Sequence, residues 1–498
     1  MSRRRLPIGI QTFREIREGD YYYVDKTGFT LRLNDEGKYY FLSRPRRFGK
    51  SLFLDTLAEL FAGNEPLFRG LDAHGRWDWG RRFPVVRLSF AEGVLRSRAE
   101  LDQRIGELLA DSEARLGAAS SHRSLPGRFQ GLIAAAHAAH GERVVVLVDE
   151  YDKPILDNLT NPDTARELRD GLRNLYSVIK GADAHIRFAF LTGVSKFSKV
   201  SLFSGLNNLI DITVDTSYSA LCGYTEADLD TTFAPELEGF DREQIRSWYN
   251  GYNWTGEAVY NPFDVLLLFQ KRQFRAWWFE TATPTFLVDV LTDRQVWLPL
   301  LGQMRADAEL LSAFDVGRIS TEALLWQTGY VTIAEQERFG EYRYRLRFPN
   351  REVYQSLSNS LLKAWTPNGQ ETLGHKARLG ELLLANDFAG LEQLFTAFFA
   401  SIPADWYRNN PIADRLEADS SALLAENQHG KRKCDFRFPS FLAARAAENG
   451  GRILPLPGLL RERVLRLLRK PGAGPHARGE QQRRTAGPGS ALQPRNGS

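Results

Sequence analysis

Between Tyr39 and Phe61 the sequence passes from a short apolar run through a basic loop into a helix-forming segment. The apolar run is Tyr39-Tyr-Phe-Leu42, the loop is Ser43-Arg-Pro-Arg-Arg-Phe-Gly-Lys-Ser51, and the helix-forming segment begins at Leu52. Amide groups at a helix N-terminus point toward an anion, and the helix dipole favours negative charge there. This order of strand, loop and helix is therefore typical of a site that holds nucleotide phosphates.

Four residues at the end of the loop have predicted roles in binding. We expect Lys50 to reach the β- and γ-phosphates and the hydroxyl of Ser51 to hold Mg²⁺. The backbone amides from Phe48 and Gly49 through Ser51 would bind phosphate oxygens. The sequence therefore predicts ATP and Mg²⁺ as ligands.

The arginines of the loop are harder to interpret. The usual phosphate-binding pattern begins with Gly, and Arg44 stands in that place, so the motif alone is only moderately specific. Arg46 or Arg47 would assist charge neutralisation at the phosphates. A structural role for these two arginines is an equal alternative.

A second segment supplies acidic residues at the end of a strand. The run Val144–Val148 is continuous, apolar and β-branched, which is typical of a strand buried on both faces of a parallel sheet. Asp149 and Glu150 follow at its carboxyl end, where open α/β sheets bind ligands. We expect Asp149 to bind Mg²⁺ through water and Glu150 to polarise the attacking water. The alternative is an acidic strand end that faces solvent.

A third apolar strand, Ile186–Thr192, ends in a polar residue. If it lies beside the strand that ends in Asp149, Thr192 can contact the γ-phosphate or the attacking water. An ordinary exit from strand to loop is an equal alternative for Thr192. Lys196 and Lys199, which follow, would touch phosphate or be solvated.

Composition limits the class of protein. A chain of 498 residues suggests about three domains. The net charge of +4 does not by itself indicate nucleic-acid binding. The two cysteines, Cys222 and Cys434, form no disulfide framework or metal cluster and favour a reducing compartment. With no secretory signal and no run long enough to span a membrane, we expect a soluble, cytoplasmic protein with no membrane partner.

The chain changes character along its length. Alternating strands and helices over residues 1–220 predict an α/β fold with a parallel sheet. Residues 221–320 are helix-like and aromatic, and packing of these aromatics in a core is favoured over stacking on nucleic-acid bases. Residues 321–413 suggest a winged-helix-like and helical region. There the outer face of a strand carries Arg343, Arg345 and Arg347, which would meet DNA phosphates or, as we favour, be solvated.

The chain resembles a bacterial and archaeal family that joins an AAA-like P-loop ATPase to a C-terminal nuclease domain of the PD-(D/E)XK superfamily. The resemblance spans residues 5 to about 413 and implies an AAA/ASCE-like core, and it makes Arg44 a family trait. It also implies a coupling of ATP to DNA cleavage. The segments that carry it are Leu6–Ile10, Tyr23–Thr27, Tyr40–Ser51, Val148–Pro154, Leu191–Ser198, Phe203–Asn208, Trp248–Tyr252, Tyr260–Pro262, Phe348–Asn350 and Trp406–Pro411. Within Tyr23–Thr27 we interpret Asp25 as a buried aspartate bonded to a basic neighbour.

Residues 414–498 depart from the family pattern. No Phe, Tyr or Trp follows Phe441, and the end of the chain from Pro471 is rich in Gly, Pro, Arg and Gln, which cannot bury a core. Read one nucleotide later, permitted codons for Leu456–Gly489 can encode an aromatic helix followed by a strand-like segment with an acidic residue. We therefore interpret this tail either as a disordered segment or as the product of a frameshift that replaced the nuclease domain.

The predicted function is Mg²⁺-dependent binding and hydrolysis of ATP, without nuclease activity in this chain. Two alternatives stay open, a nucleotide-switched DNA-binding protein without turnover and an active PD-(D/E)XK endonuclease. ATP is the expected partner, and DNA and a second copy of the chain are further candidates.

Overall fold

The parallel sheet predicted for the first part of the chain is present. The computed structural model describes residues 3–196, 202, 206, 208–282, 285–294, 304–307, 311, 319–339, 341–365, 369–391 and 393–394. The chain divides into two compact units, Met1–Thr372 and Leu373–Ser498. The predictions for Lys199 and for residues 414–498 lie outside the described residues.

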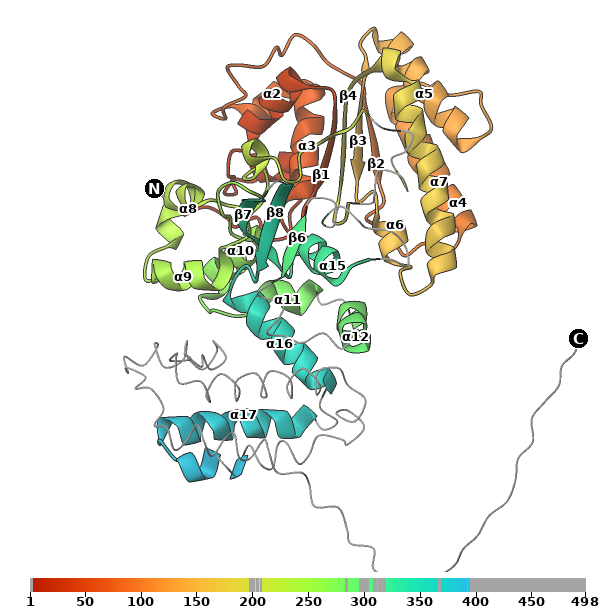
Figure 1. Cartoon of the computed structure of the whole chain (residues 1–498). Coiled ribbons are helices and arrows are strands. Elements are labelled where there is room, and N and C mark those ends of the chain that lie inside the picture. Colours follow the sequence, from red (N-terminus) through yellow and green to blue (C-terminus); the bar gives the residue numbers. More distant parts are fainter. Residues whose placement is uncertain are drawn as a thin grey trace, which may run out of the picture. The chain divides into compact units, whose positions relative to one another are not determined.

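The first unit is built on a five-stranded sheet with the order β2-β3-β4-β1-β5. Its strands are β1 (Tyr39–Ser43), β2 (Val85–Ser89), β3 (Val144–Asp149), β4 (Ile186–Gly193) and β5 (Ile210–Asp211). All neighbouring pairs are parallel. Every residue of β3 is buried, as its unbroken apolar run predicts. β4 lies between β1 and β3, and because the three strands are parallel, their carboxyl ends lie at one edge of the sheet (Figure 1). This arrangement confirms the P-loop type of α/β core.

Helices cover this sheet. α3 (Lys50–Phe61) packs on β3 and β4, whereas α4 (Arg98–Leu116) packs on β2 and α5 (Leu125–His140) on β3. α4, α5 and α7 (Pro162–Gly181) lie together, away from α2 (Thr27–Glu36) and α3 (Figure 1). Asn161 caps α7, because its side chain accepts a hydrogen bond from the amide of Thr164. The short elements of this part are α1 (Phe13–Glu18), η1 (Glu65–Phe68), α6 (Lys153–Leu156) and η2 (Asp183–His185).

A helical segment follows β5. It contains η3 (Thr216–Tyr218), α8 (Glu226–Thr232), η4 (Ala234–Glu236), α9 (Arg242–Tyr249), α10 (Pro262–Lys271), α11 (Trp277–Ala282) and α12 (Thr285–Asp293). Its aromatic residues are mostly internal: Tyr249, Tyr252, Trp254, Tyr260 and Trp278 are buried. Core packing is therefore confirmed for these five rings, which are not available to stack on bases.

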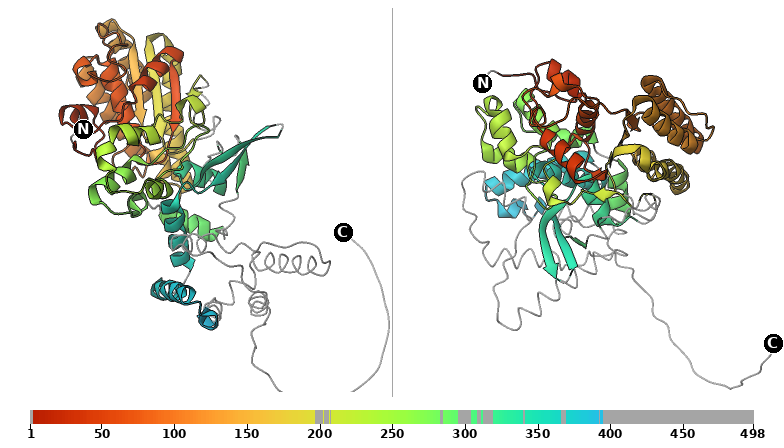
Figure 2. Two further views of the ribbon diagram at one scale, coloured as in Figure 1. Left: turned by 90° about the vertical axis from the view of Figure 1, so that its left-hand side faces the viewer. Right: turned by 90° about the horizontal axis from the view of Figure 1, so that it is seen from above.

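The last part of the first unit contains an antiparallel sheet with the order β6-β8-β7. α15 (Thr321–Thr328) leads into a long hairpin of β7 (Thr332–Phe339) and β8 (Glu341–Arg347), seen clearly in Figure 2. β6 (Arg305–Asp307) pairs with β8, and α16 (Arg351–Trp365) follows. Most of α17 (Gly369–Leu384) belongs to the second unit. In β8, Arg343, Arg345 and Arg347 are exposed, as predicted for its outer face. Tyr344 and Leu346 are buried, whereas Tyr342 is exposed.

The basic face of β8 is partly neutralised by its neighbour. Arg345 forms an ion pair of 2.8 Å with Glu335, and Arg343 lies opposite Glu337 in the register of the hairpin. Such pairs reduce the positive charge that this face offers to phosphate. In the part of the chain that the structure describes, no helix combines the length and apolar character needed to cross a membrane.

Candidate phosphate-binding site

The predicted phosphate loop joins the end of β1 to the start of α3. Gly49 is the N-cap of α3 and has φ +89°, a left-handed backbone that a side chain would strain. No side chain caps this end of the helix. No capping side chain therefore occupies the position in front of the first amides of α3, where helix N-termini bind anions.

Lys50 ties the loop to the acidic end of β3. Its side chain is buried, and its Nζ donates a hydrogen bond to the carbonyl oxygen of Pro45 at 3.2 Å. The same Nζ lies 3.5 Å from Oε1 of Glu150. Lys50 and Glu150, predicted from segments far apart in the sequence, are therefore in direct contact.

Asp149 and Ser51 also meet. Asp149 is buried, and burial is the main factor that raises the pKa of its carboxyl, followed by the charge of Glu150. A hydrogen bond with Ser51 and the charge of Lys50 act in the opposite direction. A hydroxyl beside a carboxylate is an oxygen pair of the kind that Mg²⁺ prefers. Among the described residues, no group of three or more His, Cys, Asp or Glu could hold a metal ion.

Glu150 has an unusual backbone. Its φ is +50°, in the left-handed region that glycine favours, and its amide donates to Oδ1 of Asp149 at 3.0 Å. A non-glycine residue in this conformation costs free energy and is held by its surroundings, which is common at functional sites. The turn directs the two neighbouring carboxylates differently, so that Glu150 faces Lys50 while Asp149 faces Ser51.

Arg44 is not a phosphate ligand. Its side chain is fully buried, its guanidinium donates to the carbonyl oxygens of Ser43, Thr213 and Tyr218, and it lies 4.1 Å from the ring of Trp254. Burial lowers the pKa of Arg44 to about 10, so it stays charged at neutral pH. Arg44 therefore holds the base of the loop.

The middle of the loop packs against the helical segment. Arg46 and Arg47 are exposed, and the guanidinium of Arg47 lies 4.7 Å from the ring of Phe263. Phe48 is buried, with its ring 4.7 Å from that of Tyr252. Only the backbone of Phe48 can therefore serve phosphate, whereas both arginine heads remain at the surface of the loop.

Two predicted phosphate contacts find other partners. Thr192 is fully buried, and its hydroxyl donates to the carbonyl oxygen of Leu42 at 3.0 Å, inside the sheet. Lys196 forms an ion pair of 2.5 Å with Asp211. The structure lends no support to phosphate contacts by these two side chains.

The interpretation of Asp25 as a buried residue is wrong. Asp25 is exposed and accepts hydrogen bonds from the amide and hydroxyl of Thr27 and from the amide of Asp72. Its basic neighbour Lys26 pairs instead with Asp228 at 2.7 Å. The pair Asp25 and Lys26 therefore connects the start of α2 to two separate parts of the chain.

Sequence reasoning missed Asp152. This residue is fully buried and accepts hydrogen bonds from the amide of Val194 at 3.1 Å, from the amide of Ser195 at 2.6 Å and from the hydroxyl of Ser195. Burial first, and the charge of Glu150 second, raise its pKa to about 6. Asp152 thus joins the exits of β3 and β4. The signal available in the sequence was a third acidic residue, Asp152, two positions after Glu150.

A small polar cavity adjoins the site. It has a volume of ≈ 180 Å³ and includes the metal-binding candidates Ser51 and Asp149 in its lining. One wall is an ion pair of 2.6 Å between Arg87 and Asp55. The cavity leaves room beside the two candidate ligands for water or a bound ion.

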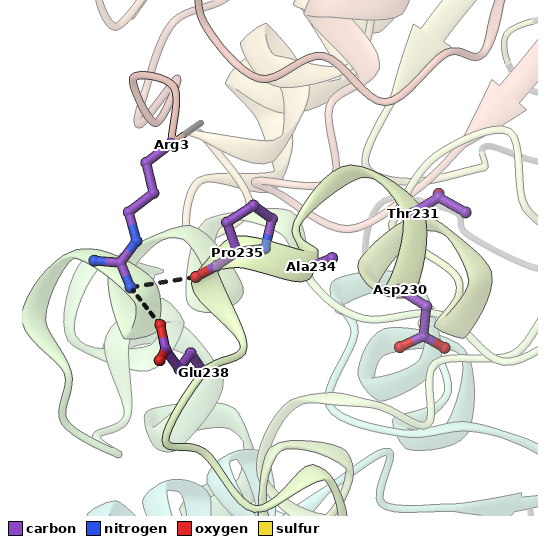
Figure 3. Close-up of a pocket in the computed structure, with 6 residues that line it drawn as sticks. All are labelled: Arg3, Asp230, Thr231, Ala234, Pro235 and Glu238. Atoms are coloured by element: carbon purple, nitrogen blue, oxygen red, sulfur yellow. Dashed lines mark hydrogen bonds and ion pairs between the residues drawn. The ribbon is translucent and has the colours of Figure 1, made fainter. Parts of the chain in front are cut away.

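A larger groove lies elsewhere. Its volume is ≈ 590 Å³, and it lies beside α8 and η4. Figure 3 shows Arg3 directed at the carbonyl of Pro235 and the carboxylate of Glu238. None of the predicted site residues line this groove, so volume alone does not identify the functional site.

Comparisons with known proteins agree with the loop geometry. The family described as Predicted AAA-ATPase matches residues 7–203. The chain is also 69% identical over 415 residues to an "Uncharacterized protein in vnfD 5'region" of Azotobacter chroococcum mcd 1, covering 83% of this chain and 80% of that protein. No solved structure matches the chain.

Proposed function

Residues 7–203 match the predicted AAA-ATPase family, and from this premise we propose that the chain binds ATP with Mg²⁺ and hydrolyses the terminal phosphate. The observation that carries the proposal is the contact between Lys50 and Glu150, 3.5 Å apart, at the edge where β1 and β3 end. A phosphate-binding lysine and a water-orienting carboxylate are what phosphoryl transfer requires at one place.

Each residue of the site has a separate task in this proposal. Lys50 and the amides from Phe48 to Ser51 hold the phosphates, and bound ATP takes Lys50 away from the carbonyl of Pro45. Ser51 and Asp149 would hold Mg²⁺, which neutralises charge on the phosphate oxygens when bound. Glu150, released from Lys50, orients the attacking water and accepts its proton.

The remaining predicted ligands have lesser roles. The heads of Arg46 and Arg47 are exposed at the loop and available to neutralise charge on the phosphates. We assign Thr192 to support of the contact between β1 and β4, because its hydroxyl is bonded there.

The test compares two variants with wild type. Glu150→Gln is expected to keep ATP affinity within about threefold while turnover falls at least about 100-fold, because only the water-orienting carboxylate is lost. Lys50→Ala is expected to weaken ATP binding at least about tenfold. Binding is measured by titration with a fluorescent ATP analogue and turnover by phosphate release with Mg²⁺.

Lys271→Ala, an exposed lysine in α10, is the control for loss of positive charge and should match wild type. ATP hydrolysis that persists in Glu150→Gln would contradict the assigned role. A wild-type protein that fails to bind ATP would contradict the proposal as a whole.

A nucleotide-switched protein without turnover is the second candidate. It is favoured by the packing of the phosphate loop against the downstream helices, where the indole of Trp278 donates to the carbonyl of Arg46. In this case wild type would bind ATP without releasing phosphate, and Glu150→Gln would change nothing. DNA is the partner to test first, with the arginines of β8 as its surface.

A further inference from the structure

Trp278 connects the downstream helices to the phosphate loop. It lies in α11 and is buried, and its indole N–H donates to the carbonyl oxygen of Arg46 at 3.2 Å. Its ring packs against Tyr330 with the ring centroids 5.3 Å apart. The donor therefore sits in a fixed position beneath the loop rather than at the end of a mobile side chain.

A second element touches the same part of the loop. Gly329, at the end of α15, has φ +88°, and a Cβ there would lie 2.7 Å from two side-chain carbons of Pro45. Only glycine therefore allows α15 to approach this closely. The carbonyl of Pro45 accepts a hydrogen bond from Lys50, which belongs to the phosphate site. The carbonyl of the next residue, Arg46, accepts one from Trp278, which belongs to the downstream helices.

Glu352 fixes the backbone of Trp278. This carboxylate, in the first turn of α16, is 1% exposed. Its Oε1 accepts the amide of Trp278 at 2.9 Å and that of Phe279 at 3.3 Å. Because these amides lie in the first turn of α11, Glu352 caps α11 from another helix. The position of the indole thus depends on α16.

Gln327 makes a parallel connection to the neighbouring strand. It is 2% exposed in α15, its Oε1 accepts the amide of Lys196 at 3.0 Å, and its Nε2 donates to the carbonyl of Leu311 at 2.8 Å. Lys196 follows the end of β4, the strand beside the loop. The downstream elements thus contact the exits of both β1 and β4.

We propose that Trp278, held by Glu352, is a positioning residue that keeps the phosphate loop in its nucleotide-binding conformation. The first part of this inference, that Trp278 fixes the conformation of the loop, concerns the loop alone and can be measured without nucleotide. The second part, that ATP affinity depends on Trp278, rests on the proposed function. The indole of Trp278 contacts the backbone of the loop, whereas the attacking water is assigned to Glu150. Loss of this hydrogen bond therefore affects ATP binding more than the chemical step.

Trp278→Phe tests the inference because it keeps an aromatic ring and removes only the N–H donor. We expect hydrogen exchange of the amides from Arg46 to Gly49 in the nucleotide-free protein to rise at least about fivefold. ATP affinity should fall by about threefold to tenfold. Turnover at saturating ATP should stay close to wild type, so KM changes and kcat does not.

Two Glu352 variants separate positioning from a general structural role. Glu352→Gln retains an oxygen that can accept both amides, so amide exchange in the loop should stay at the wild-type rate. Glu352→Leu has no such oxygen, and its loop exchange should rise as in Trp278→Phe. Trp248→Phe in α9 is the matched control, and it should leave loop exchange unchanged. Thermal unfolding of each variant identifies any loss of fold, and Trp278→Phe decides the question if Glu352→Leu does not fold.

Unchanged exchange of the loop in Trp278→Phe overturns the inference. Faster exchange with unchanged ATP affinity overturns its second part. If wild type itself fails to bind ATP, the proposed function falls, while the exchange measurement still decides whether Trp278 positions the loop.

Discussion

Arg44 shows how far a single residue can depart from what its place in a motif suggests. It occupies the position where a phosphate loop usually has Gly, yet its side chain turns into the core and donates to the carbonyls of Ser43, Thr213 and Tyr218. Hydrogen bonds to a charged group are stronger than those between neutral groups, and loss of the donor leaves buried carbonyls without a partner. Arg44 therefore contributes to folding rather than to chemistry.

Arg44→Leu is expected to lower the free energy of unfolding by about 3 kcal/mol, because it removes these charged hydrogen bonds from a buried site. Urea denaturation followed by circular dichroism measures the loss. Arg46→Leu, on the exposed part of the same loop, is the control and should change stability by less than about 0.5 kcal/mol. Equal losses in the two variants would refute the structural role of Arg44.

At the scale of elements, two helices begin with buried carboxyl groups. Asp264 lies in the first turn of α10 and Glu352 in the first turn of α16. Burial foremost, and then Glu352, raise the pKa of Asp264 well above its ordinary value. The groups that face this pair include Tyr249 and Tyr252, which are buried, and neither supplies positive charge. Folding therefore shifts the titration of Asp264 toward its protonated form, relative to the unfolded chain.

Asp264→Asn is expected to change how stability depends on pH. Because the pKa of Asp264 is higher in the folded protein, the folded state binds more protons than the unfolded state. Its contribution to stability is present at acid pH and lost as the pH rises through the raised pKa. Asn carries no charge, so the variant should gain stability over wild type as the pH rises above the ordinary titration range of an Asp carboxyl.

Urea unfolding at several pH values measures this difference. Asp111→Asn, an exposed aspartate in α4, is the control and should show no such gain. A constant difference between Asp264→Asn and wild type across the pH range would refute the shared burial of the two carboxyls as the cause.

At the scale of the whole molecule, the open question is what the proposed ATP hydrolysis would act on. The resemblance implies a C-terminal nuclease, but the chain has no Phe, Tyr or Trp after Phe441. The absence of Phe, Tyr and Trp after Phe441 is the sequence observation on which the expectation of a lost nuclease domain rests. The segment in question, residues 414–498, lies outside the described residues.

We therefore expect the full chain to hydrolyse ATP without cleaving DNA in Mg²⁺ or Mn²⁺. The measurement is a plasmid-cleavage assay run beside the phosphate-release assay, with Glu150→Gln as the control for ATP-dependent effects. Cleavage by the wild-type chain would contradict this expectation. The nucleotide sequence behind residues 414–498 tests the frameshift, since unrelated codons or stop codons in the next reading frame would exclude it.

The sequence by itself determined the elements whose signals are local. The strand Val144–Val148 and the loop from Ser43 to Ser51 follow from apolar runs, glycine and short polar side chains within a few residues of each other. These patterns also predicted that Lys50, Ser51, Asp149 and Glu150 belong together, because the carboxyl ends of parallel strands meet at one edge.

Only the tertiary structure decided where the other side chains of the site point. Arg44 turns into the core, Thr192 bonds within the sheet, Asp152 joins the exits of β3 and β4, and Trp278 supports the loop from far along the chain. Each depends on a partner distant in sequence, and burial with hydrogen bonding to that partner outweighs the local pattern. A motif therefore names the residues that can bind phosphate, and the packing around them determines which ones are placed to do so.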